Sequence, residues 1–147
     1  MARSRMQTLP LWVAAAWVGS LTTLGFFVVP MLFVHLPTPA MAGALAAKLF
    51  TAQTWISVAC GMLLLAIFRS NKPLAPVQTA QAATLFVVAG VLLAALVEFA
   101  VAPRIVARDN LALWHRVGSA MYLAQWVCAL VVFGKLATNM DGSELKS

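Results

Sequence analysis

Glu98 is the side chain of this 147-residue sequence that most invites a chemical role. Among ten basic and four acidic side chains, it alone sits clearly inside a long apolar segment. A carboxylate in hydrocarbon needs a partner or a proton, and residues of this kind mark sites in membrane proteins. Glu98 precedes Pro103 by five residues, which places it roughly 7 Å inside the end of its segment at a helical rise of about 1.5 Å per residue.

Other polar residues gather at the same end as Glu98. If each long apolar segment is a helix that crosses a membrane, successive segments run in opposite directions, and segment ends that are far apart in sequence meet at one membrane face. The predicted group consists of His35, Lys48, Glu98, Arg104, His115 and Arg116. We therefore expect a polar site at this face.

The partner of Glu98 is expected to come from another helix. Arg104 is six residues further on and lies poorly for a pair within one helix, so His115, Arg116 and Lys48 are the candidates. One interpretation is an interhelical clamp that fixes how the third and fourth segments meet. A second is a small polar pocket that binds an ion, a proton or a headgroup, and a third is a lipid-facing Glu98 that snorkels outward.

His35 and His115 are the two histidines and could ligate a metal or, as a pair, haem. His35 stands at the extreme end of its segment, which is shallow for haem, and His115 beside Trp114 is typical of an interfacial residue. We therefore expect no metal, no cofactor and no catalytic residue, with haem kept as the alternative.

The elements that carry these residues are four apolar segments. The chain is 63% hydrophobic and 10% charged, against about 25% charged in ordinary soluble domains. A span needs about 20 apolar residues. The pattern predicts an all-α, transmembrane four-helix bundle forming one domain over 1–147, with spans at approximately 10–35, 41–68, 79–103 and 110–136. The sequence has no basic cluster with interleaved aromatics, so nucleic-acid binding is not expected.

Prolines and glutamines shape the spans. Pro30 lies inside the first span and is expected to kink it, and Pro103 is expected to end the third. The sequence around Gln53 in the second span resembles the sequence around Gln125 in the fourth, and the segment before Pro30 resembles the segment before Pro103. A parallel repeat of two helical hairpins is therefore possible.

Cation counting favours both termini in the cytoplasm. The terminal side would hold Arg3, Arg5, Arg69, Lys72, Lys135 and Lys146, and the opposite side Lys48, Arg104, Arg108 and Arg116. The polar site then lies at the non-cytoplasmic face.

Short motifs over nearly the whole chain carry a family resemblance. They are Trp17-Val-Gly-Ser, Gly25-Phe-Phe-Val-Val-Pro30-Met-Leu-Phe33, Leu36-Pro37, Ala42-Gly43, Lys48-Leu49-Phe50, Pro103-Arg104 and Trp114-His115-Arg116-Val-Gly-Ser119. The chain resembles the transmembrane protein 205-like family, which are small four-helix membrane proteins of bacteria and eukaryotes. The resemblance implies a bacterial inner-membrane protein of undefined activity, with eukaryotic relatives linked to platinum-drug resistance and secretion. The resemblance also implies that six positions are important for the structure or function of the protein, namely Pro30, Lys48, Pro103, Arg104, His115 and Ser119.

The layout is also similar, more distantly, to the copper-resistance membrane domain and to bacterial haem-linked protoporphyrinogen oxidase. Those proteins use several intramembrane histidines, whereas this chain has none in the middle of a span. We expect a non-enzymatic accessory or small transporter-like module, and the rival is a haem- or metal-binding redox protein. Its expected partners are the lipid bilayer and, because it is small for a transport pathway, a second copy or another membrane protein.

Overall fold

The computed structural model describes residues 2–70 and 77–144, and the side chains of 8–70 and 82–138. All described regular elements are helical. The first rod joins α1 (Ala2–Thr22), the π-helical turn η1 (Thr23–Val28) and α2 (Val29–His35), and the second is α3 (Pro39–Ser70). The third joins α4 (Val77–Leu96), the π-helical turn η2 (Val97–Val101) and α5 (Ala102–Val106), and the fourth is α6 (Leu111–Glu144).

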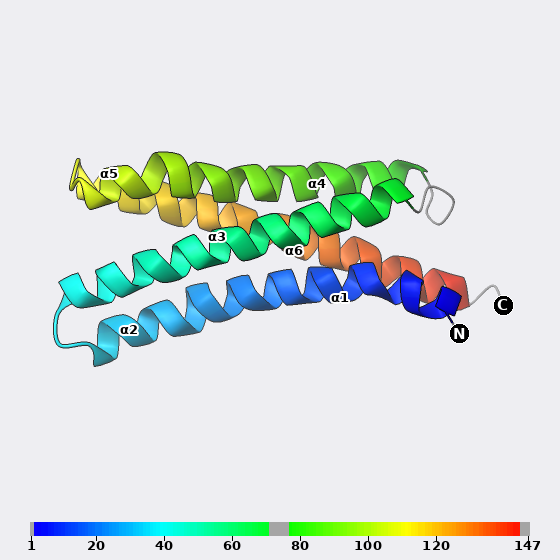
Figure 1. The fold of residues 1–147 in the computed structure, drawn as a ribbon, viewed down its shortest axis with the longest axis horizontal. Coiled ribbons are helices and arrows are strands. Elements are labelled where there is room, and N and C mark those ends of the chain that lie inside the picture. Colours follow the sequence, from blue (N-terminus) through cyan, green and yellow to red (C-terminus); the bar gives the residue numbers. More distant parts are fainter. Residues whose placement is uncertain (1, 71–76, 145–147) are drawn as a thin grey trace.

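The four rods form an all-α bundle, as the sequence predicts. Each contains a stretch long and apolar enough to cross a membrane, at Thr8–His35, Pro39–Ser70, Ala82–Val106 and Leu111–Thr138. Helix α1 packs on α3 and α6, and α4 packs on the same two helices, so the rods form a ring. Figure 1 shows the start of α1 and the end of α6 at one end of the bundle. At the other end, the α2–α3 hairpin diverges from α5 and α6.

Pro30 and Pro103 each follow a π-helical turn. The N–H of Val29 bonds to the carbonyl of Leu24, five residues back, and that of Ala102 bonds to Val97 in the same way. A proline has no N–H to donate to the preceding turn of its helix. The backbone hydrogen bonds around such a gap rearrange here into the wider π-helical turn. The prediction that Pro103 ends the third span is wrong, because the helix continues to Val106. Pro10 lies inside α1.

The core has an apolar part and a polar part. Trp17, Leu21, Leu64 and Val87 are fully buried and belong to the apolar part. Midway along the bundle, the side-chain amide of Gln53 donates to Ser20 Oγ at 3.0 Å, and that of Gln125 donates to Ser57 Oγ at 2.8 Å. Such bonds between spans hold membrane helices together where apolar burial contributes little. The first bond joins α3 to α1, and the second joins α6 to α3 across the ring.

Burial in the first and third rods supports the repeat. Four of the five buried residues described in the first rod have a buried counterpart 73 positions later in the third, Leu24 being the exception. These pairs are Pro10 and Ala83, Ala14 and Val87, Trp17 and Gly90, and Leu21 and Ala94. Pro30 and Pro103 have the same spacing. Gly90 faces Trp17, since a Cβ there would lie 2.8 Å from a carbon of the Trp17 ring. The two hairpins thus contribute corresponding positions to one interface.

Candidate functional site

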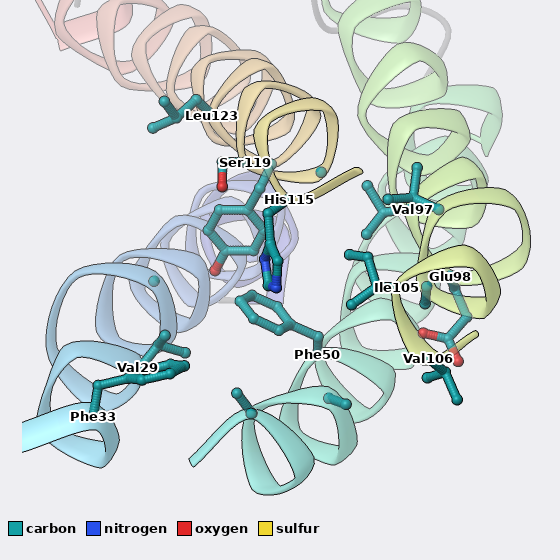
Figure 2. Close-up of a pocket in the computed structure, with 18 of the residues that line it drawn as sticks. Val29, Phe33, Phe50, Val97, Glu98, Ile105, Val106, His115, Ser119 and Leu123 are labelled. Atoms are coloured by element: carbon teal, nitrogen blue, oxygen red, sulfur yellow. The ribbon is translucent and has the colours of Figure 1, made fainter. Parts of the chain in front are cut away.

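The divergence of the hairpins leaves a cavity at the end of the bundle remote from the termini. Its volume is about 410 Å³, and residues of all four rods line it. Most of the lining is aliphatic or aromatic. Its polar members are Glu98, His115, Ser119 and Tyr122. Figure 2 shows His115 and Ser119 on α6, with Val29 and Phe33 of α2 across from them. Cavities of this size and character bind small molecules in many proteins.

Tyr122 forms the inner floor of the cavity. Its hydroxyl donates to the Leu21 carbonyl at 2.7 Å, and its ring packs edge-on against Phe50 with centroids 5.3 Å apart. Gly25 makes room for this ring, because a Cβ at that position would lie 2.5 Å from a Tyr122 ring carbon. Beyond it, Trp126 Nε1 donates to Thr22 Oγ1 at 2.9 Å. The cavity is therefore closed toward the polar centre of the bundle.

Glu98 bridges two hairpins. It lies in η2, is partly buried, and its Oε1 accepts a hydrogen bond of 2.8 Å from the hydroxyl of Thr51 on α3. The partner does come from another helix, but it is neither His115 nor Arg116 nor Lys48. The expected clamp between the third and fourth spans is instead a contact between the third and second. The described residues contain no salt bridge to Glu98, and Thr51 supplies the observed bond.

The predicted cations surround the cavity end without lining it. Lys48, Arg104 and Arg116 are all exposed and absent from the cavity wall. The Arg104 guanidinium lies 4.6 Å from the centre of the Trp114 ring, an arrangement favourable for a cation–π contact near a membrane surface. These side chains thus belong to the outer face of the bundle end.

The two histidines do not share the site. His115 is exposed and lines the cavity, and Figure 2 places it on the opposite side from Glu98, with Ile105 between them. His35 lies outside the lining, and its Nδ1 is 3.0 Å from the Met31 carbonyl oxygen. The positions therefore give the bis-histidine hypothesis no support. In the part of the chain whose side chains are described, no group of three or more His, Cys, Asp or Glu residues could hold a metal ion.

Sequence reasoning missed the apolar character of the site and the role of Thr51. A threonine is common in membrane helices, and only its depth opposite Glu98 could have singled it out. The lining chemistry suits binding: aromatic and aliphatic walls offer contacts for an apolar group, while the imidazole and the Ser119 hydroxyl can hydrogen-bond a polar one.

Comparison with known proteins places this architecture in a family. No curated protein and no solved structure matches the chain. The family described as "Domain of unknown function (DUF4149)" matches residues 12–113, which cover most of the first span, the second and third spans and the start of the fourth. The chain therefore belongs to the DUF4149 family.

Proposed function

We propose that this protein is a single-domain, non-enzymatic membrane module that binds a small amphipathic molecule in the cavity between its two hairpins. The observation that carries the proposal is the 410 Å³ cavity, whose wall is largely apolar and whose polar members include Glu98 and His115. Such a site holds an apolar group by contact and orients it through a few hydrogen bonds. An accessory factor or a small transporter-like module would need this kind of site.

The order of residues along α6 supports an amphipathic ligand. His115 lies four residues from the start of the helix, Ser119 follows one turn deeper, and Leu123 follows another turn deeper. These three side chains of α6 therefore change from polar to apolar with depth, and the Tyr122 hydroxyl beside Leu123 is already bonded to the Leu21 carbonyl. A ligand with a polar end at the membrane surface and an apolar end toward Tyr122 matches this gradient.

We further propose an inner-membrane location with both termini in the cytoplasm, which puts the cavity in the outer half of the membrane. The excess of cations on the terminal side supports this orientation. The resemblance to transmembrane protein 205-like proteins agrees with a bacterial membrane protein of this size. Transport would require a second copy or another membrane protein, because four spans are few for an alternating-access pathway.

Photolabelling tests the cavity. The protein, in lipid nanodiscs, is irradiated with a short-chain alcohol that carries a diazirine, and labelled residues are mapped by mass spectrometry. We expect labels on Phe50 and Tyr122. Gly43 lines the cavity, and no heavy atom lies within 4 Å of a Cβ built there. Gly43→Phe should therefore fill the space and remove most of that labelling without disturbing the helix.

Gly19 provides the matched control. It too has no heavy atom within 4 Å of an added Cβ, but it lies outside the cavity. Gly19→Phe should leave the labelling of Phe50 and Tyr122 unchanged. Labelling that is equal in wild type and Gly43→Phe would overturn the proposal.

A further inference from the structure

The repeat creates two interfaces between the hairpins at the cavity end. One lies between α3 and η2, and the other between η1 and α6. Residues of the second and fourth rods correspond at a spacing of 72, as for Phe50 and Tyr122, which both reach the cavity. With the spacing of 73 for the first and third rods, each side chain at one interface has a counterpart at the other. The two interfaces can therefore be compared position by position.

The interface between α3 and η2 is closed by the Thr51–Glu98 hydrogen bond of 2.8 Å. At the other interface the corresponding residues are Leu123 and Gly25, which cannot form such a bond. The backbones of α3 and η2 are in contact, whereas η1 meets α6 through the Tyr122 and Trp126 rings, which lie against Gly25 and Phe26. On the η1–α6 side the hydrogen bonds are those of Tyr122 to Leu21 and of Trp126 to Thr22, which lie at and beyond the cavity floor. Among the described residues, the hydrogen bond at the depth of Glu98 is therefore on the α3–η2 side alone.

The η1–α6 side is lined by exposed side chains. Phe26, Phe33 and Leu123 are 46%, 50% and 47% exposed, and all three line the cavity. They lie within the membrane spans Thr8–His35 and Leu111–Thr138. Figure 2 shows Phe33 and Val29 on α2 separated from Ser119 and Leu123 on α6. In a bilayer this side of the bundle is surrounded by hydrocarbon rather than by water.

Resting on the proposed function, we infer that the cavity opens sideways into the bilayer between α2 and α6 and takes up an acyl chain of a membrane phospholipid. Phospholipid chains are the apolar groups present at this depth, so they reach the opening without crossing water. The chain would lie against Phe33 and Leu123, and the more polar part of the lipid would remain near His115, close to the start of α6. Glu98 acts here as a positioning residue, which keeps the opposite side shut.

The test uses a phospholipid with a diazirine on one acyl chain, incorporated in vesicles that hold the full chain. We expect labels inside the cavity at Tyr122 and at the opening on Phe33 and Leu123, with few on Thr51. Labels confined to outward-facing residues such as Leu85 and Val127, which are 70% and 48% exposed, would overturn the inference. Equal labelling of Leu123 and Thr51 would overturn it as well.

Two neighbouring residues of α6 give a matched pair of variants. Ser119 lines the cavity at the open side, whereas Ala120, the next residue, is outside the lining; both are exposed. Ser119→Trp should remove most lipid labelling of Tyr122, and Ala120→Trp should leave most of it. A loss in both variants, or in neither, contradicts entry between α2 and α6. If the short-chain alcohol labels the cavity but the phospholipid does not, the lateral opening fails while the proposed binding function stands.

Discussion

The hydroxyl of Thr51 donates a 2.8 Å hydrogen bond to the carboxylate of Glu98 and so joins the first helical hairpin to the second. The acidic side chain lies in a π-helical turn, where the third rod has an irregular ladder. Its counterpart in the first rod is Gly25, whose lack of a side chain leaves room for the Tyr122 ring. Corresponding π-helical turns thus serve different purposes, one bridging the hairpins and one accommodating the cavity floor.

Removing the donor should destabilise the bundle modestly. Thr51→Val keeps the shape of the side chain but leaves Glu98 without its observed partner, and a hydrogen bond between membrane helices contributes about 1 kcal/mol. Thermal melting in detergent should show a lower midpoint. Thr138→Val is the control, because the Thr138 hydroxyl is exposed and bonds to the carbonyl of Gly134 in its own helix. Equal melting of the two variants would show that the contact carries no stability.

Substitutions at Glu98 separate hydrogen bonding from charge. Glu98→Gln retains an oxygen that can accept from Thr51, whereas Glu98→Leu retains none. We expect Glu98→Leu to melt at a lower temperature than Glu98→Gln, and Thr51→Val to add little to Glu98→Leu because both remove the same bond. Additive losses in the double variant would show that Glu98 and Thr51 stabilise the protein independently.

Much of the fold follows from hydropathy, while the site does not. The four spans, the membrane setting and the shared face of Gln53 and Ser57 are predictable, because apolar length and helical period determine them. The cavity depends on how far two hairpins diverge, which no local pattern encodes. The partner of Glu98 was sought among charged residues, yet Lys48 and Arg116 are exposed and the neutral hydroxyl of Thr51 is the one at the right depth.

Reporter fusions should locate the termini. Four spans place both ends of the chain on one side, and the cation count favours the cytoplasm. Alkaline phosphatase, which is active only outside the cytoplasm, should be inactive when fused after Ser147 and active when fused after Asp109, between α5 and α6. The opposite pair of activities would reverse the orientation and move the cavity to the cytoplasmic half of the membrane.

The polar centre should be sensitive to the loss of a single hydroxyl group. Ser57 Oγ accepts from the side-chain amides of both Gln53, at 3.4 Å, and Gln125, at 2.8 Å. Ser57→Ala leaves these buried donors short of an acceptor, which costs about 1–3 kcal/mol. The melting midpoint should fall further than for Ser70→Ala, whose hydroxyl is exposed and bonds to the Ile67 carbonyl. Similar midpoints would mean that the amides find other acceptors.

The contact between Trp17 and Gly90 should tolerate no added methyl group. A Cβ at Gly90 would lie 2.8 and 3.0 Å from two carbons of the Trp17 ring, and this ring is fully buried, so it has no space into which to move. Overpacking of this kind costs about 1–3 kcal/mol, and Gly90→Ala should lower the melting midpoint. Gly134→Ala adds the same methyl group where no heavy atom lies within 4 Å, and its greater helix propensity should leave the midpoint unchanged or slightly raised. If Gly90→Ala melts like Gly134→Ala, the first and third rods do not meet as closely at the bundle axis as the repeat requires.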